Sequence, residues 1–341
     1  MSESVSSIEL SIVIPTMGRP ILHKTLDSLL AAQGIDRAEI LVCGKISDPE
    51  LAERVARLCE ENDRVRHFPV VFEVGDSSEK KNVGWREATS DLVAFIDDDV
   101  AVSPDWPDRM IECFADPSVG LASGPSLVPE DIPFIARLAG LTLASKAAGY
   151  VSERYLTGDA GVREVKWSRL IGCNMVYRKK VISDLGGFDP KFWPGEEMIS
   201  AWLATEAGHK LVFVPHAYLY HYPRESLGRF WKQIFGYGAT RIRLYRAGVE
   251  FEPSALVPGI WVASLIVLLA AWPFGSWAGP LLGLNLIAYG GVAAWITAAK
   301  VMETRRASDA LMVFMVPFMH LAYGWAEWVE VFRPDRDLSM R

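Results

Sequence analysis

Three consecutive carboxylates, Asp97, Asp98 and Asp99, follow directly on the short apolar run Leu92–Ile96. The run has the length and composition of a buried strand. Ionised carboxylates are costly to bury without partners, so we expect these acids at the strand's carboxyl end, where ligands bind in open α/β sheets. Hard oxygen ligands there suit Mg²⁺ or Mn²⁺, which are commonly shared with substrate phosphates. A solvated acidic turn is the alternative, but the abrupt change from core strand to three acids favours a metal site.

A second pair of carboxylates, Glu196 and Glu197, opens a helix that we expect to run to about Ala207. Acids in a first helical turn are stabilised by the helix dipole. Ordinary helix architecture therefore explains this pair, and the pattern by itself does not require a catalytic role.

The elements that would position these acids alternate between strands and helices, which is typical of a parallel, doubly wound sheet in an α/β protein. Apolar residues recur at helical spacing between the short β-branched runs. The expected order is strand Ile8–Ile14, helix Ile21–Ala32, strand Ala38–Cys43, helix Pro49–Glu61, strand Val70–Val74, helix Asn82–Ala88, the acidic strand, helix Asp105–Phe114, strand Val119–Ser123 and a strand from Leu211 that continues to His221.

Composition narrows the class of protein. The chain has 341 residues and a net charge of −7, which argues against a nucleic-acid partner. Its four cysteines are scattered without metal-binding spacing, so a reduced, cytosolic setting is expected. Half of the residues are hydrophobic (50%), and the long apolar runs are concentrated after residue 250. We therefore expect a globular domain at 1–250 and a membrane region at 251–341.

Three apolar segments in that region, 256–274, 277–299 and 310–332, reach the roughly 20 residues needed to cross a bilayer core. The first two are free of charge. Whether the third crosses the membrane is left open by the sequence, because it contains Pro317, His320, Glu327 and Glu330.

Cationic residues flank these segments at Arg224–Arg246 and Lys300–Arg306, and the positive-inside rule places both on the cytoplasmic side. We therefore expect a multi-pass protein of the cytoplasmic membrane, with its N-terminal domain in the cytoplasm. The apolar run Ile132–Leu143 is either ordinary core or an interfacial helix. The membrane setting favours the interfacial helix.

Several motifs in this order are similar to those of one known family. The chain resembles the membrane-bound glycosyltransferases of family 2, which have the GT-A fold, and in particular members with a C-terminal transmembrane region that build bacterial surface polysaccharide on a lipid carrier. The resemblance covers residues 8 to 250, and more loosely the apolar segments. The motifs are Ser11–Pro20, Lys81–Gly84, Phe95–Asp99, Gly172–Arg178, Gly186–Asp189, Gly195–Glu197 and, in the tail, His320–Gly324.

The resemblance implies roles for particular residues. Asp99 would ligate the divalent ion with help from Asp97 and His221, and Glu197, with Glu196 beside it, would be the general base for the acceptor hydroxyl. The implied donor-binding residues are Pro15, Thr16, Arg19, Lys81, Asn82, Asp97, Asp98 and Arg224. The implied fold is a Rossmann-like, mostly parallel sheet flanked by helices, followed by transmembrane helices.

The implied reaction is metal-dependent, inverting transfer of a sugar from a nucleotide-diphosphate donor, with a UDP-sugar favoured, to a hydroxyl of a lipid-linked glycan at the membrane. Cys43-Gly44-Lys45 stands where family members often have an acid that reads the nucleobase, so the identity of the nucleobase is left open. Gln233–Tyr237 does not fit the QxxRW motif of processive synthases. The alternatives are a polyprenyl-phosphate sugar synthase and a non-catalytic nucleotide-binding scaffold at the membrane. The complete acidic triplet and the glutamate pair count against the scaffold.

Overall fold

A computed structural model describes residues 8–73, 76–158 and 161–333. These form two compact units, one of Met1–Leu127 with Glu153–Tyr222, the other of Val128–Ser152 with Pro223–Arg341. The division differs from the boundary expected at residue 250. Helices on both sides of that residue, and the segment after Leu127, pack with the C-terminal helices instead.

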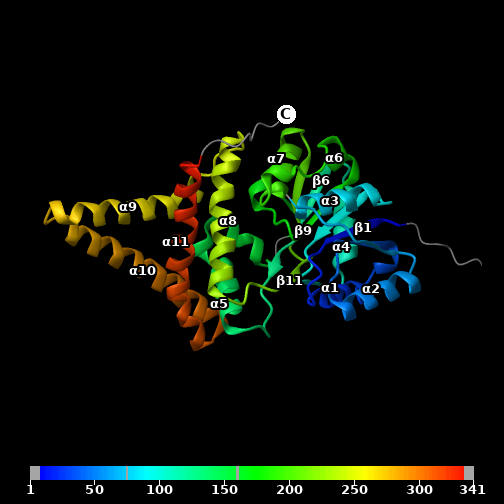
Figure 1. The fold of residues 1–341 in the computed structure, drawn as a ribbon, viewed down its shortest axis with the longest axis horizontal. Coiled ribbons are helices and arrows are strands. Elements are labelled where there is room, and N and C mark those ends of the chain that lie inside the picture. The colour runs from blue at the N-terminus through cyan, green and yellow to red at the C-terminus, as the bar shows by residue number, and fades with distance from the viewer. Residues whose placement is uncertain (1–7, 74–75, 159–160, 334–341) are drawn as a thin grey trace, which may run out of the picture. The chain divides into compact units, whose positions relative to one another are not determined.

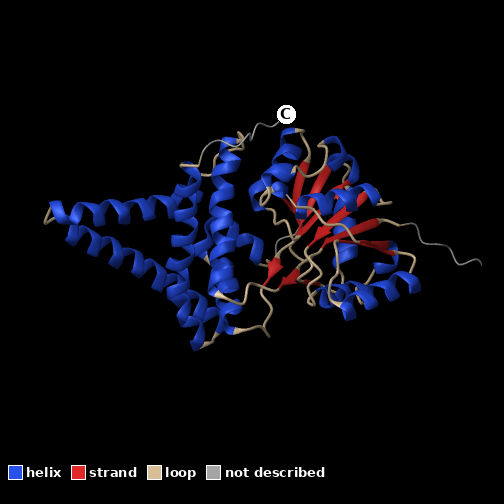
Figure 2. Ribbon diagram, viewed as in Figure 1, coloured by secondary structure: helices blue, strands red, loops and turns tan. Residues whose placement is uncertain are grey.

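The first unit is built on a mixed sheet with helices around it, shown in red and blue in Figure 2. Within the described residues the sheet has eight strands in the order β3-β2-β1-β4-β9-β6-β10-β8. Neighbours among β1 to β4 are parallel, whereas β9 is antiparallel to both β4 and β6. The strands are β1 Leu10–Pro15, β2 Ala38–Cys43, β3 Val65–Phe68, β4 Leu92–Ile96, β6 Val119–Ser123, β8 Arg163–Glu164, β9 Asn174–Arg178 and β10 Lys210–Phe213.

The expected α/β architecture is confirmed, and its physical cause is visible in the central strands. All residues of β2 and β4 are buried, as expected for central strands that are covered by helices on both faces. The helix that contains Gly84 packs closely on β1, since a Cβ atom at Gly84 would lie only 2.2 Å from a methyl group of Val13. The absence of a side chain at Gly84 allows this close approach. The helices of this unit are α1 Leu22–Leu30, α2 Pro49–Glu61, α3 Asp76–Glu87, α4 Trp106–Glu112, α6 Lys179–Asp184 and α7 Glu196–Glu206.

Two strand predictions are wrong, and proline accounts for both. The strand expected at Val70–Val74 lies earlier, at β3, and ends before Pro69; residue 74 is outside the described residues. The strand expected from Leu211 to His221 ends at Phe213, shortly before Pro215. Proline has no N–H to donate to a strand ladder, so it favours strand ends. Helix α3 also begins earlier than expected, at Asp76 instead of Asn82.

The residues near His221 form a separate small sheet. Strand β11 (Leu219–His221) pairs antiparallel with β5 (Val100–Val102) and parallel with β7 (Ser126–Leu127). In this register His221 lies opposite Val100, directly after the acidic triplet.

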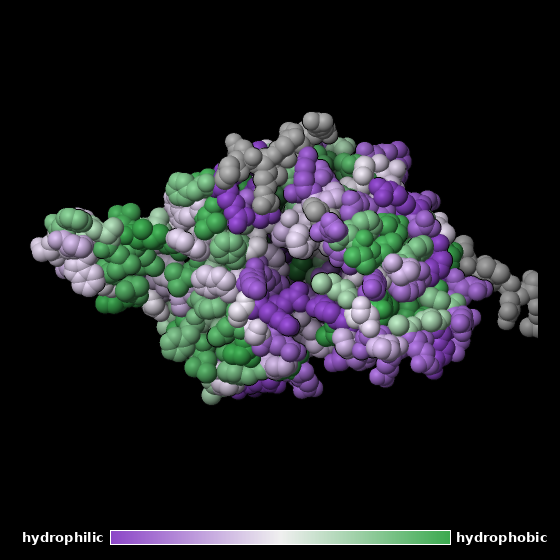
Figure 3. Space-filling model, in the orientation of Figure 1, coloured by the Kyte–Doolittle hydropathy of each residue, from purple (hydrophilic) through white to green (hydrophobic). Residues whose placement is uncertain are grey.

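The second unit is helical, with α5 Phe134–Leu143, α8 Leu227–Arg246, α9 Val257–Ala271, α10 Ala278–Thr304 and α11 Met312–Val331 (Figure 1). Three stretches, Pro253–Phe274, Ala278–Thr304 and Ala307–Val331, are long and apolar enough to cross a membrane. Figure 3 shows hydrophobic side chains gathered over the hairpin of α9 and α10. Helix α5 packs on α11 with most of its residues buried, so the interfacial role that we favoured for Ile132–Leu143 is wrong and this run is core.

Candidate active site

The acidic triplet lies at the carboxyl end of β4, beside the loop that follows β1. Asp98 is buried, and its Oδ2 atom accepts hydrogen bonds from Thr16 Oγ1 (2.7 Å) and the Met17 amide (3.2 Å). Arg19 donates to its Oδ1 atom. Because protein donors surround this carboxylate, Asp98 holds the 16–19 loop against the end of β4.

Asp99, also buried, joins the same loop to the small sheet. Arg19 Nη2 lies 2.9 Å from Asp99 Oδ2, and Nε2 of His221 lies 3.1 Å from Asp99 Oδ1. The pairing of β11 with β5 places His221 there, although 122 residues separate it from Asp99 in sequence.

Asp97, Asp99 and His221 each offer one ligand atom, and these atoms lie within 4.8 Å of one another. Two carboxylate oxygens and an imidazole nitrogen suit Mn²⁺ better than Mg²⁺, which prefers all-oxygen sites. Burial, followed by the negative charge of Asp99, raises the pKa of Asp97 to about 6. A divalent cation would offset that repulsion, so the residues fit a metal ion. That they bind one stays a prediction.

A second charged cluster joins helix α3 to the first turn of α7. Lys81 Nζ lies 3.0 Å from Glu196 Oε1 and also donates to Glu197 Oε1. The side chains of Lys81 and Glu196 are only 1% and 2% exposed, whereas that of Glu197 is 19% exposed. Glu197 is therefore the glutamate of the pair that a substrate can reach.

The two glutamates differ in their protonation because they share one cation. Burial, and then the charge of Glu197, raises the pKa of Glu196 to about 7. Burial acts in the same direction on Glu197, but the charge and hydrogen bond of Lys81 outweigh it and lower the pKa of Glu197 below its ordinary value. The accessible glutamate is thus an ionised carboxylate at neutral pH.

The remaining expected site residues have different surroundings in the structure. Pro15 ends β1 and Thr16 begins the loop at Asp98. Asn82 exchanges hydrogen bonds with the backbone of Phe188, at 2.8 Å in each direction, and so fixes the 186–189 turn. Lys81, expected among the donor-binding residues, lies with the glutamates. Arg224 belongs to the second unit.

Two residues near the site carried no assignment from the sequence. Lys80 Nζ donates to the Thr16 carbonyl at 2.8 Å and also binds Asp76, so it supports the loop that Asp98 holds. A Cβ atom at Gly172 would lie 2.8 Å from the carboxyl carbon of Glu197, so a larger residue there would require the Glu197 side chain to move. In the sequence these residues could be noticed only as the adjacent lysines Lys80-Lys81 and as the Gly172–Asn174 motif that leads into β9. Neither pattern reveals the distant residue that each one contacts.

Comparison with known families decides what this arrangement belongs to. A family model described as "Glycosyltransferase like family 2" matches residues 8–236, which include both charged clusters. The chain belongs to this family. The resemblance expected from the motifs is therefore confirmed.

Individual relatives of this family 2 chain are more distant. It is 24% identical over 230 residues (67% of this chain, 52% of the other) to poly-beta-1,6-N-acetyl-D-glucosamine synthase of Staphylococcus aureus. It is 29% identical over 169 residues (47% and 33%) to the pre-mycofactocin glycosyltransferase of Mycobacterium tuberculosis. The chain thus spans about half the length, or less, of these curated relatives.

A solved structure supports the fold along nearly the whole chain. The mannosyltransferase PcManGT from Pyrobaculum calidifontis, in complex with GDP-Man and Mn²⁺, superposes with a TM-score of 0.57 at 15% identity. The match covers 96% of this chain and 88% of the other. At this identity the likeness establishes the fold alone.

Proposed function

We propose that this protein is a metal-dependent, inverting glycosyltransferase that moves a sugar from a nucleotide-diphosphate donor to a hydroxyl of a lipid-linked glycan at the membrane. The observation that carries the proposal is the proximity of two clusters with different chemistry. Asp97, one of the three candidate metal ligands, interacts electrostatically with both Lys81 and Glu197. A cation at the first cluster and an ionised carboxylate at the second are what a single displacement at a sugar carbon needs.

In this proposal Asp97, Asp99 and His221 would hold Mn²⁺ or Mg²⁺, and the ion would supply Lewis-acid stabilisation of the departing nucleoside diphosphate. Pro15, Thr16 and Arg19 line the donor side. The oxygen of the acceptor hydroxyl bonds to the anomeric carbon while the bond between that carbon and the diphosphate breaks. Glu197 accepts the proton that the hydroxyl loses. One displacement of this kind inverts the anomeric centre.

The nucleobase of the sugar donor is the least determined part of the proposed substrate. Cys43 ends β2 fully buried, and burial raises the pKa of its thiol, so this position offers neither an exposed acid nor a thiolate. We retain a UDP-sugar as the favoured donor. The PcManGT complex contains GDP-Man, which makes a GDP-sugar the first competitor to test.

The long apolar helices support a membrane-bound acceptor. Residues 256–299 contain no charged side chain, and cationic residues lie on both sides of this stretch. By the positive-inside rule we place the first unit in the cytoplasm, on a multi-pass protein of the cytoplasmic membrane.

The deciding experiment measures binding and hydrolysis of UDP-, GDP- and dTDP-sugars, with Mn²⁺ or with EDTA, by the wild type and Asp99→Asn. We expect one donor to bind with Mn²⁺ only, and this binding to be lost in the variant. Asp184→Asn, at an exposed surface pair, is the matched control and should behave as wild type. Equal binding in EDTA, or full activity of Asp99→Asn, would contradict the metal assignment.

One observation favours a second candidate, a polyprenyl-phosphate sugar synthase. The ion pair with Lys81 makes Glu197 a weaker base, and a lipid phosphate is already ionised, so it needs little help from a base. Supplying purified enzyme with either polyprenyl phosphate or a lipid-linked glycan separates the two candidates directly.

A further inference from the structure

Helices α8 and α11 run alongside one another in the second unit (Figure 1). Phe318 of α11 stacks near Phe230 of α8, with ring centroids 6.3 Å apart. Towards the other end of both helices, Arg243 Nε lies 3.1 Å from Glu330 Oε1, with both side chains buried. The two helices are therefore joined by apolar contacts at one end and by a buried ion pair at the other.

Helix α8 does not suit a hydrocarbon environment. It carries five cationic residues that cluster towards its two ends, Arg229 and Lys232 near the start and Arg241, Arg243 and Arg246 near the end. Charged side chains in a bilayer core are rare and costly. Because α11 is packed along α8, a membrane-crossing α11 would bring these cations into the bilayer with it.

The hairpin of α9 and α10 differs from α11 in both burial and direction. In the most apolar stretch of each helix, the share of residues that are buried is 17% for α9 and 22% for α10, against 39% for α11. Figure 1 shows the hairpin projecting across the direction of α8 and α11. Helix α11 contacts the hairpin at the start of α9, where Trp328 Nε1 donates to the Gly259 carbonyl at 2.8 Å, and near the middle of α10, where the Tyr289 hydroxyl lies 2.6 Å from His320 Nδ1.

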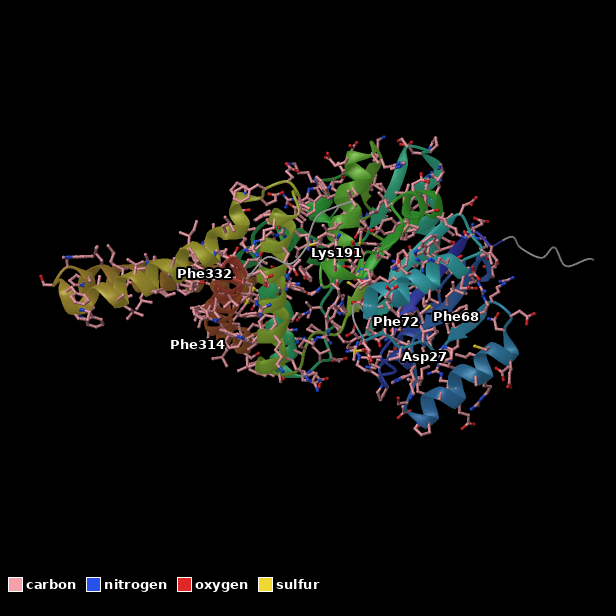
Figure 4. The ribbon with its side chains drawn as sticks, turned by 45° about the horizontal axis from the view of Figure 1, so that its top comes forward. Asp27, Phe68, Phe72, Lys191, Phe314 and Phe332 are labelled. Carbon is pink, nitrogen blue, oxygen red and sulfur yellow. The ribbon has the colours of Figure 1, made fainter. Side chains whose placement is uncertain are left out.

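The exposed apolar side chains follow the same division. On the hairpin, large apolar residues are exposed on both helices, among them Val267 and Ile287. On α11 three of them, Phe314, Leu321 and Trp325, recur at helical spacing and form a stripe, whereas Val331 at the end of the helix lies off it. Figure 4 shows Phe314 on the side of α11 towards the hairpin. A stripe of this kind lets a helix contact the lipid interface while its other faces stay packed against protein.

We propose that only the α9–α10 hairpin crosses the bilayer, and that α11 lies in the plane of the membrane surface beside α8, with its apolar stripe in the lipid interface. This rests on the membrane localisation proposed above and resolves which apolar helices contact hydrocarbon. An even number of crossings places Arg341 on the same side of the membrane as the first unit. Three crossings would place it on the opposite side.

The test uses single cysteines in the full-length chain and a membrane-impermeant maleimide carrying a polyethylene-glycol mass tag, added to intact cells. Ser276→Cys lies between α9 and α10, Ser308→Cys lies between α10 and α11, and Ser339→Cys follows α11. The four native cysteines precede all three positions and provide the internal control for sealed cells. Transfer activity in the same membranes verifies that each variant is intact.

We expect one mass tag on Ser276→Cys in intact cells, and none on Ser308→Cys or Ser339→Cys until the membrane is permeabilised. Labelling of Ser339→Cys in intact cells would overturn the in-plane assignment of α11 while leaving the membrane localisation standing. Failure to label Ser276→Cys would show that the hairpin does not cross. Recovery of the active wild type in the soluble fraction would instead refute the proposed localisation itself.

A second pair of variants tests depth separately from sidedness. Val267→Lys places a charge on the exposed hairpin, whereas Leu321→Lys places one on the α11 stripe, from which a lysine can reach the headgroups. We expect Val267→Lys to reduce the membrane-inserted fraction severalfold and Leu321→Lys to leave it near wild type. Equal losses would contradict the in-plane assignment.

Discussion

The ammonium group of Lys81 lies 3.0 Å from Oε1 of Glu196, and both side chains are almost completely buried. The same ammonium binds Glu197, the more exposed neighbour. One cation is thus shared between an internal carboxylate and an accessible one. This arrangement holds Glu197 in place and keeps it ionised, which makes Lys81 a positioning residue for the proposed base.

Replacing Lys81 by methionine should expose this dependence as a change in the pH profile. In the wild type the pKa of Glu197 is lowered, so the base remains ionised as the pH falls below neutral. Without the ammonium, burial and the second carboxylate dominate and raise the pKa of Glu197. The transfer rate of Lys81→Met should therefore fall as the pH is lowered through the neutral range, where that of the wild type stays level.

The stability of Lys81→Met should also fall at neutral pH, because breaking a buried ion pair leaves a carboxylate without its partner, at a cost of about 3 kcal/mol. Part of the stability that the ion pair gives the wild type is lost in acid, as the pH drops through the lowered pKa of Glu197. Lys180→Met, which removes an exposed lysine paired with Asp184, is the control for thermal unfolding. A Lys81→Met enzyme with an unshifted pH profile would exclude this role for Lys81.

Glu197→Gln should keep donor binding and lose transfer to a hydroxyl acceptor. Loss of a positioned general base costs about 10²–10⁴-fold in rate. The amide retains the shape of the side chain, so KM for the donor should change little. Steady-state kinetics with both acceptor classes provides the measurement. A nearly unchanged rate with polyprenyl phosphate would identify the synthase as the correct alternative.

Asp98→Asn and Asp99→Asn should fail in different ways, although the residues are adjacent. Asp98 accepts from Thr16, Met17 and Arg19, so its loss should weaken the 16–19 loop by about 2 kcal/mol and raise the KM for the donor. The Asp98→Asn variant should still respond to Mn²⁺. Asp99→Asn should lose the Mn²⁺ response itself. Titrations of Mn²⁺ against both variants would show parallel behaviour if this division of roles is wrong.

The second unit offers an independent test at Arg137 and Asp309. The guanidinium of Arg137 makes a bidentate ion pair with Asp309, at 3.0 and 2.8 Å, and this pair joins α5 to the segment before α11. Asp309 is fully buried, whereas the Arg137 side chain is 12% exposed, so Asp309→Asn leaves a partly shielded guanidinium without its partner charge, at a cost of about 3 kcal/mol. Arg306→Met, which removes an exposed pair with Glu130 at 3.8 Å, should cost less than about 1 kcal/mol. Unfolding in detergent should separate the two variants by several degrees.

Much of this protein is determined locally and was therefore predictable. The change from the apolar run Leu92–Ile96 to three acids correctly predicted a strand with the acids at its carboxyl end, because a buried strand and unpaired carboxylates have opposite solvation requirements. The apolar segments after residue 250 correspond to three long helices for a similar reason, since length and hydropathy are properties of a single segment.

Other features depend on partners that are far apart in sequence, and only the tertiary structure determined them. His221 reaches Asp99 because β11 pairs with β5 instead of continuing β10, and Lys81 meets Glu196 across 115 residues. Nothing in Glu196-Glu197 itself shows which glutamate is buried, since that is decided by how α7 packs against Lys81. The surroundings of α11 are likewise set by α8, because hydropathy measures a helix alone and does not include the charges on its neighbour.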